Sequence, residues 1–176
     1  MPGRRLRAVT LVAAILASLA VGVPGAHAVS PSVTCSGSEA ATYNPGLQLT
    51  PRTVTLNVNA TFGPCISTNP AISSGTAGTP PGGVPATLSC NSLLGTASGQ
   101  AVIHWNNGTT TRYSFNRSSQ TVLGQLITTA SGPVIAGEFL GRSVSLTAVS
   151  PALNLLDCIR PSGLTSRTAL VTLVIA

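Results

Sequence analysis

The segment Val54-Thr55-Leu56-Asn57-Val58-Asn59 alternates apolar with polar residues, and the same pattern recurs at residues 102–105 and 144–148. A period of two is the signature of a β-strand with one buried face. Three further segments are rich in threonine and β-branched residues, which favour strands: residues 110–115, 121–129 and 167–175. No helical stripe of apolar residues is sustained beyond residue 28. The chain therefore predicts an all-β fold.

Turn signals separate these segments at short intervals. Asn106-Asn107-Gly108 predicts a tight hairpin, because Asn-Gly accepts the positive φ angles of a two-residue turn. Residues 73–85 are rich in glycine and proline and predict a loop, and one helical turn fits near residues 151–157. Eight or nine short strands favour a two-sheet antiparallel β-sandwich over a barrel, with an immunoglobulin-like architecture as one form of it.

The start of the chain has the layout of a secretory signal. Three arginines lie within the first seven residues, residues 8–23 carry no charge, and the small-residue motif Ala26-His27-Ala28 follows. The apolar stretch is shorter than the ~20 residues that a membrane-spanning helix needs. We therefore predict a cleaved signal peptide at 1–28 and a single β-sandwich domain at 29–176. The mature protein is expected to be secreted and extracellular, without membrane association after signal removal.

All four cysteines lie in the predicted mature domain, and this predicts two disulfide bonds in an oxidising compartment. A zinc site would need ligands two to four residues apart, so no metal and no cofactor are expected. Four cysteines allow three pairings. Residues 36–43 and 53–62 have the pattern of one hairpin, which would bring its flanking cysteines together. We therefore favour the pairing Cys35–Cys65 with Cys90–Cys158.

Charge argues against nucleic acid as a partner. Beyond residue 28 the chain has six arginines, no lysine and three acidic residues, and the arginines are scattered. A phosphate backbone requires a clustered basic surface. The basic residues are better explained as a solvated surface.

The sequence contains few residues that could carry out hydrolysis, and we assign no catalytic residue. A serine hydrolase needs a base and an orienting acid, and His104 is the one histidine beyond the signal. Glycoside hydrolysis needs two facing carboxylates, for which Glu39, Glu138 and Asp157 are the available residues.

Trp105 and His104 are the candidate ligand contacts. A lone indole before a tight turn can stack on a sugar ring, but the commoner role of such a residue in a sandwich is the central core aromatic. His104 beside it is more often a structural or surface residue than a base.

Several short motifs resemble those of a group of small secreted actinobacterial proteins with four cysteines. They include Cys35-Ser-Gly37, residues 42–52 (TYNPGLQLTPR), Trp105-Asn-Asn-Gly108, residues 137–141 (GEFLG) and residues 151–158 (PALNLLDC). The likeness covers nearly the whole predicted mature chain. It implies an extracellular compartment and a four-cysteine framework, and it implies no activity or ligand.

These features together predict a secreted non-enzymatic binding or structural module. Its partner would be an unknown extracellular protein or glycan. The alternative is a secreted hydrolase or a hydrolase (protease) inhibitor, in which residues 45–51 would form the exposed inhibitory loop.

Overall fold

The computed structural model describes Ser30 and residues 32–176, so the predicted signal peptide and its cleavage point lie outside the described residues. The strands are β1 (Val33–Leu47), β2 (Arg52–Ser67), β3 (Gly75–Gly78), β4 (Val84–Leu88), β5 (Gly95–Trp105), β6 (Thr110–Val122), β7 (Gln125–Gly137), β8 (Ser143–Pro151) and β9 (Leu164–Ile175). A 3₁₀ helix, η1 (Asn91–Leu93), and a short helix, α1 (Leu155–Ile159), complete the chain. Among the described residues, no helix has the length and apolar character needed to cross a membrane.

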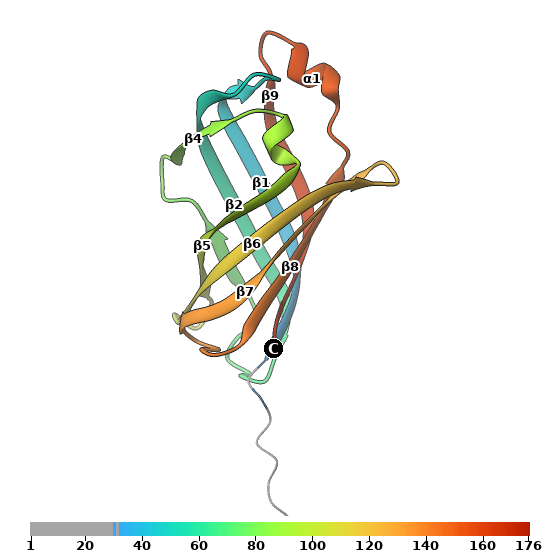
Figure 1. Ribbon diagram of the computed structural model, residues 1–176. Helices are drawn as coiled ribbons and strands as arrows, with labels where there is room; N and C mark the ends of the chain where they lie inside the picture. The colour runs from blue at the N-terminus through green and yellow to red at the C-terminus, as the bar shows by residue number, and fades with distance from the viewer. Residues whose placement is uncertain (1–29, 31) are drawn as a thin grey trace, which may run out of the picture.

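The strands form a closed antiparallel barrel (Figure 1). Eight strands follow one another in the order β1-β9-β8-β7-β6-β5-β3-β2, and a further pairing of β1 with β2 closes the ring. Cys35 on β1 thus lies opposite Cys65 of β2 on one side and opposite Leu173 of β9 on the other. The ninth strand, β4, is paired to β2 and stands outside the ring.

The all-β class is confirmed, but the predicted two-sheet β-sandwich, with its immunoglobulin-like form, is wrong. Alternating side chains bury one face of a strand in a sandwich and in a barrel alike, so the period of two does not distinguish them. The outcome depends on whether the first and last strands pair, and here they pair along most of their length. The strands are also long, with 15 residues in β1 and 16 in β2, rather than short.

The predicted turns are mostly confirmed. The Asn106-Asn107-Gly108 hairpin joins β5 to β6, and α1 begins after Asn154, whose side chain accepts a hydrogen bond from the Leu156 N–H at 3.1 Å. The predicted strand 121–129 is wrong in one respect, because Leu123 and Gly124 form a turn within it, both with positive φ. Leu-Gly is not the usual sequence for such a turn, so its signal was missed.

Two buried clusters close the barrel ends. The lower core lies where β1 begins and β9 ends, and its large members include Phe62, Ile103, Trp105, Phe139, Leu173 and Ile175. The upper core lies at the other end, near η1 and α1, and includes Tyr43, Leu47, Val54, Leu93 and the cysteine pair of that end.

Both disulfides have the pairing that the hairpin argument favoured. Cys35–Cys65 links β1 to β2 within the lower core, and Cys90–Cys158 links the start of η1 to α1 in the upper core. The first bridge cross-links strands that are already hydrogen-bonded neighbours. The second joins two segments that are 68 residues apart in sequence, and it holds η1 and α1 together at the upper end of the barrel.

We expect the double variant Cys90→Ser/Cys158→Ser to lose about 4 kcal/mol of unfolding free energy, from the loop-closure entropy of a 68-residue separation. Urea unfolding followed by the fluorescence of Trp105, the single tryptophan, measures this loss. The native protein under identical conditions is the reference. A loss below about 1 kcal/mol would show that the bridge does not constrain the chain in this way.

Candidate functional site

Small side chains leave a cavity of about 420 Å³ inside the barrel, between the lower and upper cores. Its wall contains seven alanines from six strands: Ala41, Ala60, Ala77, Ala97, Ala101, Ala130 and Ala148. An eight-stranded barrel is just wide enough for side chains to fill it or for one small ligand. The alanines leave empty the space that leucine or valine would occupy.

Three charged side chains line this cavity: Glu39 from β1, Arg117 from β6 and Arg167 from β9. Each lies opposite alanine on a neighbouring strand. Ala60 and Ala169 flank Glu39, Ala97 and Ala130 flank Arg117, and Ala41 lies opposite Arg167. The alanines therefore provide the room in which long charged side chains lie inside the barrel.

The charged groups face one another across the lumen. In the eight-strand ring β1 and β6 are four places apart in either direction, so their inner faces are opposed. Arg167 Nη2 lies 3.5 Å from Glu39 Oε1, and these side chains are only 11% and 20% exposed. Arg117 Nε is buried and has no hydrogen-bond partner among the described residues. With two arginines and one glutamate, the cavity has an excess of positive charge.

Both tyrosines of the chain also line the cavity. Burial, with a smaller contribution from the Glu39 carboxylate, raises the pKa of Tyr113 to about 12. Burial also raises the pKa of Tyr43, while the Arg167 charge acts in the opposite direction. Burial and the like charge of Arg167 lower the pKa of Arg117, but a guanidinium keeps its proton at neutral pH. The site thus combines protonated phenols with a positive charge.

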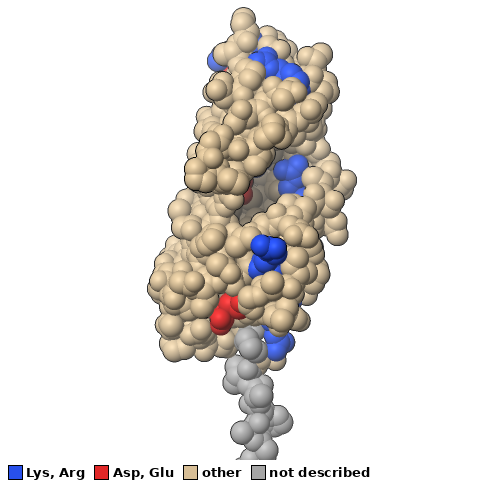
Figure 2. Space-filling view, turned by 90° about the vertical axis from the view of Figure 1, so that its left-hand side faces the viewer, with Lys and Arg blue, Asp and Glu red and all other residues tan. Residues whose placement is uncertain are grey.

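A gap in the barrel wall gives access to the cavity from the side. The pairing of β3 with β5 ends at Ala77 opposite Ile103. Beyond it, residues 95–102 of β5 pair with β6 on one edge and with no strand of the described chain on the other. Residues 95–100 are exposed on both faces of the strand. Figure 2 shows this face of the molecule deeply hollowed, with acidic atoms inside the hollow and basic atoms at its edge.

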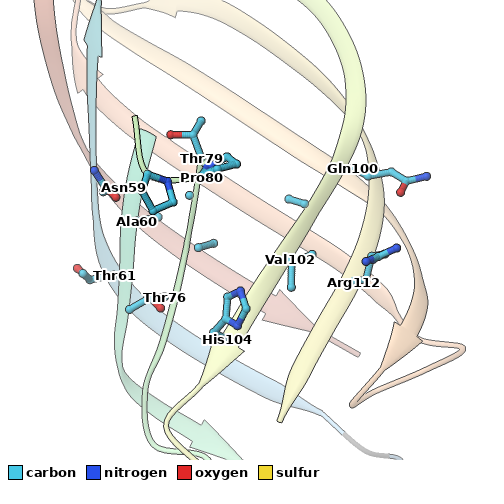
Figure 3. Close-up of a pocket in the computed structure, with 14 residues that line it drawn as sticks. Asn59, Ala60, Thr61, Thr76, Thr79, Pro80, Gln100, Val102, His104 and Arg112 are labelled. Atoms are coloured by element: carbon cyan, nitrogen blue, oxygen red, sulfur yellow. The ribbon is translucent and has the colours of Figure 1, made fainter. Parts of the chain in front are cut away.

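A second hollow, of about 640 Å³, lies against the outer surface of the wall at this gap (Figure 3). We call it the outer groove. Its wall includes polar side chains from β2, β3, β5 and β6, among them Asn59, Thr76, Gln100, His104 and Arg112. Six residues line both this groove and the inner cavity: Ala60, Ala77, Gly78, Thr79, Gln100 and Ala101. The two spaces therefore adjoin.

The two candidate ligand contacts lie on opposite faces of β5. Trp105 is 4% exposed in the lower core, packs edge-to-face on Phe139 with ring centroids 5.9 Å apart, and donates its indole N–H to Thr111 Oγ1 at 2.8 Å. Its ring is thus occupied by core contacts rather than presented for stacking. His104 is exposed and lines the outer groove.

The structure does not bring together the residues that a hydrolase would need. Glu39 lies inside the barrel, and Glu138 follows β7 near the lower end, where it accepts a hydrogen bond from Asn69 Nδ2 at 3.2 Å. Asp157 lies at the opposite end in α1 and pairs with Arg160 at 3.2 Å (Figure 1). The described part of the chain contains no group of three or more potential metal ligands.

The proposed inhibitory loop, residues 45–51, lies at the upper end, where residues 45–47 end β1 and residues 48–51 connect it to β2. The Gln48 carbonyl accepts a hydrogen bond from the Cys90 N–H at 2.8 Å, so the loop is tied to the upper core. The Cys35–Cys65 bridge lies near the other end of both strands and does not brace it. The inhibitor alternative stays a prediction.

The sequence-based reasoning missed Arg117 and Arg167 as site residues. A signal was present, because Arg167 is in phase with the buried Ala169, Val171 and Leu173, and Arg117 is in phase with Tyr113. A charged residue at an inward position of an alternating strand marks an interior polar site. Glu39 was considered only as one of three acids, although it has the same phase as the buried Ala41.

The two tyrosines provide a direct test of this interior. In the folded protein we expect Tyr113 to ionise with a pKa of about 12 and the pKa of Tyr43 to lie above its ordinary value. In urea both tyrosines should ionise near the ordinary value of about 10, and tyrosinate absorbance reports both states. Because the pKa of Tyr113 is higher in the folded than in the unfolded protein, burial of its neutral phenol contributes to the unfolding free energy below pH 10. This contribution is lost as the pH rises towards 12. Circular dichroism recorded in parallel confirms that the protein is folded. Ionisation of both tyrosines near pH 10 in the folded state would contradict their burial.

Comparison of the chain with protein-family models, with curated proteins and with solved structures finds no match. The resemblance to the actinobacterial four-cysteine proteins therefore stays a prediction.

Proposed function

We propose that this protein is a secreted, non-enzymatic binding protein that holds a small, largely apolar organic anion inside its barrel. The observation that carries the proposal is Arg117, a cation inside the lumen whose Nε is buried without a hydrogen-bond partner among the described residues. Burying an unpaired polar group costs free energy, and an anionic ligand would remove that cost through charge-assisted hydrogen bonds.

The position of Arg167 strengthens the case for an anion. Glu39 pairs with Arg167 on one side of the lumen, and Arg117 projects from the opposed strand. Burial, and after it the like charge of Arg167, lowers the pKa of Arg117, so the two guanidinium groups act on each other electrostatically. An anion placed between them would interact favourably with both.

The remaining wall suits an apolar body. It includes the aliphatic side chains of Leu56, Val58 and Leu146 and the rings of Phe62 and Phe115, besides the alanines. Small-molecule sites are typically apolar clefts of about 300–1,000 Å³ with a few polar groups that fix orientation, and this cavity of about 420 Å³ falls within that range. The tyrosine hydroxyls add hydrogen-bond donors for a second polar atom of the ligand.

The ionisable groups of the cavity support binding rather than hydrolysis. Glu39 is held by Arg167, and the raised pKa values of Tyr43 and Tyr113 keep both phenols protonated near neutral pH. General-base catalysis requires a group whose pKa lies near the working pH. His104, the one histidine of the described residues, lies on the outer surface and not in the cavity.

Two observations support an extracellular location. Both predicted disulfides form, which fits an oxidising compartment, and the chain begins with the features of a secretory signal.

Arg117→Gln tests the anion site. Anilinonaphthalene sulfonate, an aromatic anion, should bind the native protein with enhanced fluorescence, and the variant should bind it about tenfold to a hundredfold more weakly, because a charge-assisted hydrogen bond is lost. Phenylnaphthylamine has the same rings without the sulfonate and should bind both proteins alike. If the anion binds both proteins equally well, Arg117 does not hold it.

Glu39→Gln is expected to raise the affinity for the sulfonate probe, where Arg117→Gln lowers it. Removing the single carboxylate of the cavity leaves Arg167 unpaired, so affinity for the sulfonate should rise while the unfolding free energy falls. Ala130→Leu serves as the control for the cavity itself, since the larger side chain should exclude both probes. Fluorescence titration measures binding and urea unfolding measures stability. Unchanged binding of both probes to Ala130→Leu would place them outside the barrel.

A further inference from the structure

We propose that the ligand has two parts: an apolar anion inside the barrel and a hydroxyl-rich head, such as a sugar, in the outer groove. The inner part rests on the proposed function. The outer part rests on separate observations, namely the gap in the wall and the side chains that surround it.

Among the described residues, the barrel ends offer no comparable path to the cavity. The lower core closes one end with large side chains such as Trp105 and Phe139, and the upper core closes the other beneath η1, α1 and their disulfide. The side gap between β4 and the upper half of β5 remains as the route through the described chain. A ligand that fills the lumen would therefore have one end at this gap.

The gap is built by a defined turn. After β3 the Thr79 N–H donates to the Val58 carbonyl at 3.0 Å, and Thr79 Oγ1 accepts from the Val58 N–H at 3.1 Å. The chain then turns through Pro80 to Gly83, whose N–H donates back to the Pro80 carbonyl at 2.9 Å, and continues as β4 along β2. Gly83 has a φ of +78°, which favours glycine. The turn takes the chain away from β5 and leaves the wall open.

The outer groove has the chemistry of a site for hydroxyl groups. Figure 3 shows Asn59 and Thr61 on one side, Gln100 and Arg112 on the other, and His104 between them. Amide and hydroxyl groups both donate and accept hydrogen bonds, as sugar hydroxyls do. None of the described residues that line the groove is acidic. The groove is thus richer in polar groups than the inner cavity.

Because the two hollows share lining residues at the gap, we take them to be open to each other there, so that one molecule can occupy both. Gly78 and Ala101 line both hollows at the gap, and neither has a side chain larger than a methyl group. A Cβ at Gly78 would collide with the Val58 carbonyl oxygen, so this position requires glycine. Gln100 also lines both spaces, and its amide is placed to contact a group that passes from one to the other.

Three matched probes test the proposal by calorimetric titration: octanoate, octyl glucoside, and the glucoside of hydroxyoctanoic acid, which carries a carboxylate at one end and glucose at the other. The two-part probe should bind about tenfold more tightly than octanoate, through several added hydrogen bonds. The double variant Asn59→Ala/His104→Ala, whose side chains line the outer groove and not the inner cavity, should remove most of this advantage and leave octanoate binding unchanged. Arg117→Gln should weaken both carboxylate probes. Thr129→Ala, an exposed outward position on β7, is the matched control and should change nothing.

The outcomes separate the two proposals. If octanoate binds and loses affinity in Arg117→Gln, but the glucose adds nothing, the two-part ligand is wrong and the inner anion site stands. If the glucose adds affinity that survives in Asn59→Ala/His104→Ala, the head does not lie in the outer groove and the inference is overturned. If neither carboxylate probe responds to Arg117→Gln, the anion site itself is wrong, and the two-part proposal fails with it.

Discussion

The first strand, β1, is hydrogen-bonded along both edges, to β2 on one side and to β9 on the other. This double pairing joins the two ends of the sheet and leaves no free edge at β1. It also gives the inward-facing side chains of eight strands a single shared interior. Glu39 and Arg167 meet because they lie diagonally across the β1–β9 pair, and Arg117 faces them because β6 is the strand opposite β1.

The cavity follows from the size of the side chains placed in that interior. Large residues fill the two ends, and alanines with a few long charged side chains occupy the middle. An empty space loses packing contacts, and a buried charge loses hydration, so this middle layer reduces stability. The two cores and the two disulfides offset that loss at either end of the barrel. Local instability of this kind is expected where a protein keeps room for a ligand.

The break between β3 and β4 gives the same barrel an opening. Residues 73–85, predicted as one loop, contain β3, which is needed to close the ring, and a turn that directs the following strand away from β5. Four residues of β3 with glycine at both ends carry too weak a period of two to be recognised as a strand. Their pairing is decided by β2 and β5, which lie on either side of them.

The sequence by itself determined the local features: strands with alternating faces, the Asn107-Gly108 turn, and the nearness of Cys35 to Cys65 through one hairpin. It also placed His104 and Trp105 on opposite faces of one strand, because the period of two is a property of the backbone. Only the tertiary structure decided between barrel and sandwich, and only it assembled Glu39, Arg117 and Arg167 into one site. The physical reason is that both outcomes depend on hydrogen bonds between strands far apart in the chain, which an alternating pattern permits but does not specify.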